Sequence, residues 1–163
     1  MTLPPASTKF LALLSEFSVQ MQLPHDPDAL GLEISLGEQS AHVFPHPQHD
    51  ERLLVLIAVL SLGADQALGA VPASHWLFLH RLNNSAWPEH NWQILVDDDN
   101  TLILRCDRDM ALTTANALEE LLLDGLERAQ SLALLWRDLA NSGLDISNCS
   151  LEGASPEAGF IRA

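Results

Sequence analysis

The sequence has very few cationic residues. It contains a single lysine, Lys9, and only eight Lys and Arg residues together, against 22 Asp and Glu residues. The resulting formal net charge of −14 repels phosphate backbones and anionic lipid headgroups. We therefore exclude nucleic acid and membrane surfaces as expected partners. What remains is a soluble protein, or one whose partner carries basic segments.

Cysteine is also scarce. Cys106 and Cys149 are too few and too far apart for a secreted disulfide framework or a structural zinc site, and Cys106 reads as a small core residue. Residues 1–10 lack the basic and apolar regions of a signal peptide. The longest apolar run, Leu53–Leu60, is too short to cross a bilayer. We expect a cytoplasmic protein.

Motifs of catalysis are missing too. There is no G-x-S-x-G, no G-x-G-x-x-G and no phosphate-binding loop, and tyrosine is absent altogether. We therefore predict no enzymatic activity and no cofactor. One alternative is a small metal-dependent enzyme that uses His42, His46, His49 and Asp50, although two prolines interrupt these candidate ligands. The run Asp97–Asp99 lacks the calcium-loop pattern, and a hairpin turn accounts for it.

The first half of the chain predicts a helix and three strands. Ser7 or Thr8 can cap the helix, and Pro24 ends it. Alternation then predicts a strand from Leu30 to Leu36 and a returning strand over Ala41–Phe44. The run Leu53–Leu60 favours a third strand that is apolar on both faces, so something must cover its second face. The apolar face of the helix comprises Phe10, Leu13, Leu14, Phe17 and Met21.

The second half predicts a short helix over His75–Asn83, a hairpin from Trp92 to Cys106 and a long final helix capped by Thr113 or Thr114. The fold class is thus α+β: a five-stranded, mostly antiparallel, twisted sheet with three helices in the order α-β-β-β-α-β-β-α. A chain of 163 residues is one domain's worth. We expect this single domain to span residues 1–143, with residues 144–163 as a flexible tail.

The sequence contains more apolar side chains than a single thin hydrophobic core needs. The strand over Leu53–Leu60 is apolar on both faces, and the helix that contains Trp76, Leu77, Phe78 and Leu79 has little polar surface. Either feature alone fits an ordinary core. Together they favour association with another protein or with a second copy of the chain.

With these features the chain resembles the class I type III secretion chaperones, of the Tir chaperone type. The resemblance covers roughly Ser7–Leu139 and rests on size, acidity, element order and a weak pattern. That pattern includes Leu77–Asn83, similar to the family's Leu-Leu-x-x-Asn-like second helix, and the hairpin Trp92–Cys106. It ends with Ala129 and Trp136 in the last helix. The sequence departs from the family at Ala86–His90 and in its His- and Pro-rich loop.

The resemblance implies a cytoplasmic homodimer that binds the non-globular N-terminal segment of a secreted effector and keeps it export-competent. The alternative is a regulatory or scaffolding protein of the same fold. The secretion ATPase is a further candidate partner. The implied dimer residues are Trp76, Leu77, Phe78 and Leu79; the implied effector-binding residues, chosen from strand parity and the family's arrangement, are Phe10, Leu14, Phe17, Ile34, Val43, Phe44, Leu54 and Leu56.

Overall fold

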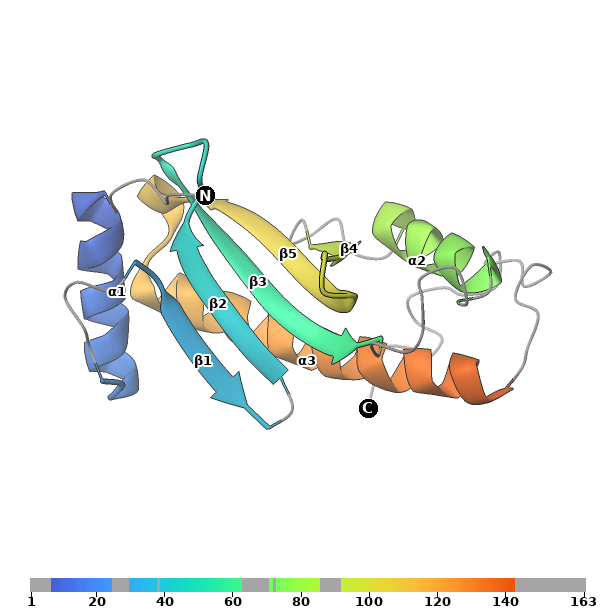
Figure 1. Ribbon diagram of the computed structural model, residues 1–163. Helices are drawn as coiled ribbons and strands as arrows, with labels where there is room; N and C mark the ends of the chain where they lie inside the picture. Colours follow the sequence, from blue (N-terminus) through green and yellow to red (C-terminus); the bar gives the residue numbers. More distant parts are fainter. Residues whose placement is uncertain are drawn as a thin grey trace.

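Figure 1 shows the computed structural model of the protein, which describes residues 7–24, 30–37, 39–62, 71, 73–85 and 92–142. The predicted tail, residues 144–163, lies outside the described residues. None of the helices that the structure describes is long and apolar enough to cross a membrane.

The first helix, α1, spans Thr8–Met21 and begins as the sequence predicts. The Ser7 side chain accepts a hydrogen bond from the Phe10 backbone N–H at 3.3 Å, which satisfies one of the unpaired donors of the first turn. The helix ends at Gln22, whose left-handed backbone turns the chain before Pro24. The buried side of α1 consists of Phe10, Leu13, Leu14, Phe17 and Ser18.

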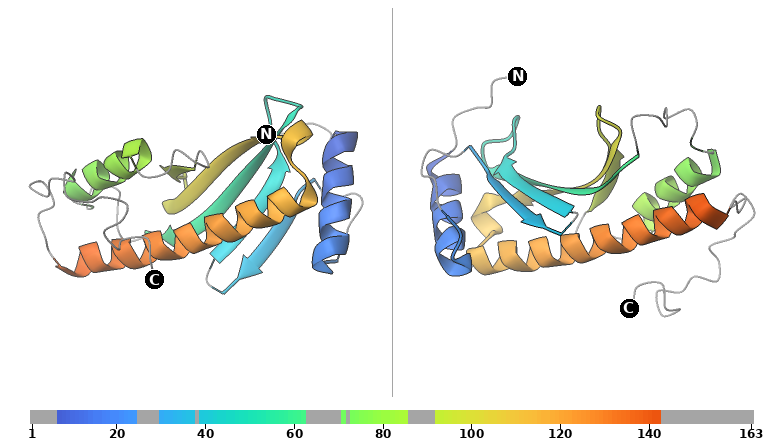
Figure 2. Two further views of the ribbon diagram at one scale, coloured as in Figure 1. Left: turned by 180° about the vertical axis from the view of Figure 1, so that it is seen from behind. Right: turned by 60° about the horizontal axis from the view of Figure 1, so that its bottom comes forward.

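The sheet has five strands in the order β1-β2-β3-β5-β4, and every neighbouring pair is antiparallel. The predicted α+β fold with five strands and three helices is confirmed. The sheet curves so that its concave side faces away from the longest helix (Figure 2). The strands are β1 Leu32–Leu36, β2 Gln39–Pro45, β3 Arg52–Ser61, β4 Gln93–Val96 and β5 Thr101–Asp109.

The first strand starts later than predicted. Leu30 is exposed and precedes β1, although its spacing continues the alternation of Leu32 and Ile34. Gly31 gives the reason: a Cβ there would lie 2.7 Å from the Val43 carbonyl oxygen and 3.2 Å from the Phe44 Cβ. The chain passes so close to β2 at this point that only glycine fits, and regular pairing begins one residue later.

The third helix, α3, spans Ala115–Ser142 and lies along the convex face of the sheet (Figures 1 and 2). Its predicted cap is confirmed at Thr114, whose hydroxyl accepts the Ala117 N–H at 3.2 Å. α1 packs against α3 beside β1 (Figure 1). The core between these elements includes Val43, Val55, Ile57, Leu104, Leu118 and Ala129.

Gly125 allows α3 to approach the sheet closely. A Cβ at this position would clash with Ile57 Cδ1 and would lie 2.5 Å from Cζ2 of Trp92. The indole of Trp92 is 2% exposed, and its N–H donates to Asp124 at 2.9 Å. Asp124 in turn accepts from the Arg128 guanidinium at 2.9 and 3.0 Å. Helix, tryptophan and strand β3 therefore meet at a position where the helix has no side chain.

The second helix, α2, spans Ala73–Ser85, two residues longer at each end than the predicted helix, and lies beyond β4 (Figure 1). The predicted turn between β4 and β5 is confirmed. Asp97 Oδ1 accepts the backbone N–H of Asp99 at 3.1 Å and that of Thr101 at 2.7 Å, while Asn100 adopts φ 58°. These local hydrogen bonds explain why an aspartate stands at position 97, the first residue of the run Asp97–Asp99.

Candidate partner-binding surface

The two faces of the sheet differ in what covers them. Residues whose side chains lie toward α3, such as Val43, Val55 and Leu104, are fully buried. Because successive side chains on a strand alternate between faces, the even-numbered residues of β2 and the first part of β3 lie on the concave face. None of the described helices lies across that face (Figure 2).

The register places apolar side chains next to one another on the concave face. Phe44 is opposite Leu54, and Ala58 is opposite Ile103, which is opposite Leu95 in turn. Leu56 lies between these two rows on β3. The stripe therefore runs diagonally from β2 along β3 to β4, and its length along β3 is about 13 Å. We call this set the concave stripe: Phe44, Leu54, Leu56, Ala58, Ile103 and Leu95.

Exposure varies along the concave stripe. Leu95 is 37% exposed, Phe44, Leu56, Ala58 and Ile103 are half-buried, and Leu54 is 7% exposed. Neighbouring apolar groups that stay this accessible leave hydrophobic free energy unrealised, at about 25 cal/mol per Å² of apolar area. A partner that covered the stripe would recover part of this free energy.

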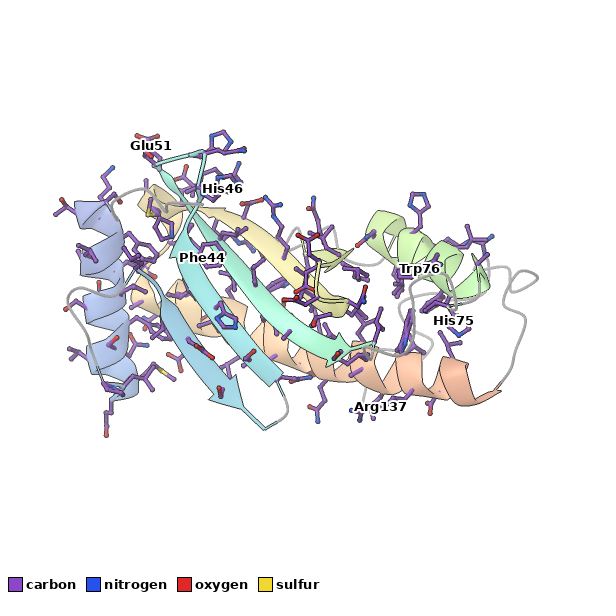
Figure 3. All side chains as sticks on the ribbon, in the orientation of Figure 1. Phe44, His46, Glu51, His75, Trp76 and Arg137 are labelled. Atoms are coloured by element: carbon purple, nitrogen blue, oxygen red, sulfur yellow. The ribbon has the colours of Figure 1, made fainter. Side chains whose placement is uncertain are left out.

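A polar cluster borders the stripe near the turn between β2 and β3. The Arg105 guanidinium contacts a carboxylate oxygen of Asp107 at 3.1 Å, and His46 Nε2 lies 3.4 Å from the other carboxylate oxygen. His46 Nδ1 accepts the Gln48 backbone N–H at 3.1 Å, which places the proton of the neutral ring on Nε2. Nε2 lies 3.4 Å from the Asp107 oxygen and 3.4 Å from the Arg105 guanidinium. Figure 3 shows His46 just beyond Phe44, beside the turn that carries Glu51.

Burial affects the protonation of His46. Loss of hydration lowers the pKa of His46 below its ordinary value, while the nearby carboxylate of Asp107 opposes the shift. A protonated ring would also direct Nδ1–H at the Gln48 N–H, where two donors would meet. The geometry therefore favours neutral His46 in the folded protein.

The predicted effector-binding residues separate into two groups. Phe44, Leu54 and Leu56 belong to the concave stripe. Val43 is fully buried on the opposite face, and Ile34 packs against the same core from β1, opposite Ala41. The three residues chosen from α1, namely Phe10, Leu14 and Phe17, are at most 3% exposed and belong to the core.

The four predicted dimer residues lie on α2 with different exposures. Leu77 is 41% exposed, Trp76 and Phe78 are half-buried, and Leu79 is 5% exposed. The indole of Trp76 packs near that of Trp136 on α3, with ring centroids 6.1 Å apart. Figure 3 shows Trp76 and His75 between α2 and the last turns of α3. Leu77 is thus the member of this set most available to a second chain.

The histidine-rich loop makes contacts of its own. The rings of His46 and His49 lie 4.7 Å apart, and His42 Nε2 lies 3.4 Å from the Ser40 hydroxyl. Among the described residues, no group of three or more His, Cys, Asp or Glu side chains is placed to hold a metal ion.

Several members of the surface were not predicted from the sequence. Ala58, Ile103 and Leu95 complete the concave stripe, and Arg105 and Asp107 form its polar border. Strand alternation puts Leu95 between Ile94 and Val96, and Ile103 and Arg105 between Leu102, Leu104 and Cys106, so all three lie on the second face of the hairpin. The pattern does not show that this face lies next to Leu56 and Ala58, because that position depends on the pairing of β3 with β5.

No protein-family model matches the sequence, and no curated protein matches it significantly. Solved structures do match. One, from the ExsC–ExsE complex, has a TM-score of 0.63 at 18% identity and covers 81% of this chain and 96% of that chain. The Yersinia pestis type III secretion chaperone SycH, in complex with a stable fragment of YscM2, has a TM-score of 0.55 at 16% identity. This match covers 72% of this chain and 94% of that chain.

A third match, from the ExoT–SpcS complex of Pseudomonas aeruginosa, has a TM-score of 0.53 at 13% identity and covers 76% of this chain and 97% of that chain. Identities this low establish the fold alone. The element order, the sheet and these matches agree with the resemblance inferred from the sequence. The chain has the fold of the class I type III secretion chaperones.

Proposed function

We propose that this protein is a secretion chaperone that binds the N-terminal, non-globular segment of a type III effector and keeps it export-competent. The observation that carries the proposal is the concave stripe, an apolar surface that no described helix covers. The fold supports it, because the similar structures include a type III secretion chaperone in complex with another protein and the HopA1–SchA chaperone–effector complex.

The acidity of the chain is consistent with this role. A partly exposed apolar stripe favours self-aggregation, and a net charge of −14 opposes it by repulsion between copies. A client segment that is apolar at its centre and basic at its ends would match both the stripe and the surrounding field. On this proposal the protein acts in the bacterial cytoplasm, without catalysis and without a cofactor.

We also propose that the chain forms a homodimer through α2. The exposed side of this helix carries Leu77, and Trp76 and Phe78 are only half-buried in the single chain. A second copy packed against this helix would cover these side chains, since an interface of about 800 Å² per subunit is sufficient for a stable dimer. Each dimer would then present two concave stripes to its clients.

The direct experiment is co-expression with the protein encoded by the adjacent gene, followed by co-purification. In the bound state Leu56→Asp would place a carboxylate against the client's apolar side chains. Losing a buried leucine contact alone costs about 1.5–3 kcal/mol, or roughly 10- to 150-fold in Kd. We expect Leu56→Asp to abolish co-purification and to leave the circular dichroism spectrum unchanged.

Leu134→Asp is the matched control. Leu134 is 56% exposed on α3, away from the concave face, so the substitution introduces the same charge on an unrelated apolar site. The control variant should retain the client. If both variants bind the client equally well, the concave stripe is not the binding surface. If the wild-type protein retains no client, a regulatory protein of the same fold becomes the better account.

A further inference from the structure

A side chain of α2 takes the place of a neighbouring strand at the edge of the sheet. The Asn83 side-chain amide donates to the Ile94 carbonyl oxygen at 2.9 Å. The Ile94 backbone N–H donates to the Asn83 side-chain oxygen at 2.6 Å. A carboxamide presents one acceptor and one donor side by side, as a peptide group of an adjacent strand does.

The direction of these bonds shows which edge is occupied. In an antiparallel ladder, the N–H and C=O of one residue point to the same side of the strand. Ile94 is opposite Leu104 of β5, yet both of its backbone groups point to Asn83. They therefore point outward, at the edge of the sheet where none of the described strands pairs with β4.

The occupied position is the middle of a short edge. β4 has four residues, Gln93–Val96, and outward-pointing backbone groups recur at every second residue. With Ile94 occupied, the next outward positions are Trp92 and Val96, which lie about 13 Å apart along the strand. An added strand needs consecutive ladder bonds, and these two positions cannot supply them.

We infer that Asn83 blocks the β4 edge against pairing with extended segments of other chains, including a second copy of this protein. Unpaired edges are templates for aggregation, and proteins commonly protect them with charges, prolines or covering elements. Here a single amide from a neighbouring helix provides the protection. The same bonds fix the C-terminal half of α2, whose N-terminal half is held by the contacts of His75 and Trp76 with Trp136. This inference does not depend on the chaperone proposal.

The test compares Asn83→Ala and Asn83→Asp with the wild-type protein. Asn83→Ala removes both bonds, whereas Asn83→Asp retains an acceptor for the Ile94 N–H but turns an oxygen toward the Ile94 carbonyl. Gln93→Ala is the control, because it alters β4 without affecting the Asn83 side chain. Hydrogen exchange by NMR reports on the Ile94 amide, and analytical ultracentrifugation over a concentration series reports on association.

We expect the exchange rate of the Ile94 amide to rise roughly tenfold in Asn83→Ala, equivalent to about 1.4 kcal/mol, and to rise less in Asn83→Asp. Asn83→Ala should also form concentration-dependent species larger than those of the wild type. Gln93→Ala should match the wild type in both measurements. Wild-type exchange in both Asn83 variants would overturn the inference, and so would faster exchange without additional association.

Discussion

Gly125→Ala tests how tightly α3 packs on the sheet. In the interior of an exposed helix, this replacement stabilises by about 1 kcal/mol, because alanine restricts the unfolded chain and favours helix. At position 125 the new methyl group would lie 2.5 and 2.6 Å from two ring atoms of Trp92. Overpacking of this kind costs about 1–3 kcal/mol. We therefore expect a net loss of up to about 2 kcal/mol, in contrast to the usual gain.

The clash is hard to relieve because the indole is fixed. The terminal methyl group of Ile57 can rotate away, but Trp92 is buried and its N–H is hydrogen-bonded to Asp124. The decisive measurement is a double-mutant cycle with Trp92→Leu, which removes the ring atoms that the new methyl group would meet. Urea unfolding followed by far-UV circular dichroism gives the four free energies of unfolding.

We expect Gly125→Ala to be less destabilising, or even stabilising, in the Trp92→Leu background, with a coupling free energy of about 1–2 kcal/mol. Two results would refute the reasoning. One is a gain of about 1 kcal/mol from Gly125→Ala in the wild-type background. The other is an equal effect of the substitution in both backgrounds, because it would show that the methyl group does not contact the indole.

Three further predictions concern a histidine, a thiol and the proposed dimer. Burial lowers the pKa of His46, so the unfolded chain binds the proton more readily; stability should fall as the pH drops through about 6.5, and His46→Gln should flatten this part of a urea-midpoint profile. Burial raises the pKa of the Cys106 thiol, so in a Cys149→Ser background a thiol reagent should react only as fast as the protein unfolds; rapid labelling of the native state would contradict the placement of Cys106. Light scattering should give twice 17.9 kDa for the wild type and for Leu134→Glu, but a monomer for Leu77→Glu; a normal dimer from Leu77→Glu would refute the α2 interface.

Much of the fold could be predicted from local patterns. The caps at Ser7 and Thr114 follow from the hydroxyl side chains that precede helical periodicity. The hairpin between β4 and β5 follows from strict alternation around an Asp- and Asn-rich turn. These features depend on residues close together in the sequence, so the sequence carries the information directly.

The candidate surface was harder to predict, because it depends on which face α3 covers. The run Leu53–Leu60 is apolar on both faces, so periodicity gives no preference between Leu54 and Val55. The residues of α1 present a related ambiguity: an apolar helical face such as that of Phe10 and Phe17 fits a core as well as a partner. In the structure both aromatic rings are in the core.

The position of α3 after all five strands has a consequence for synthesis. Strands β1 to β5 emerge from the ribosome before Ala115–Ser142, the segment that covers their convex face. Until that helix emerges, a nascent sheet would present apolar side chains on both faces, Val55 and Ile57 on one and Leu54 and Leu56 on the other. Stable folding of the sheet should therefore wait for α3, and until then the growing chain should depend on general protection against aggregation. A protein proposed to protect another chain would first need protection itself.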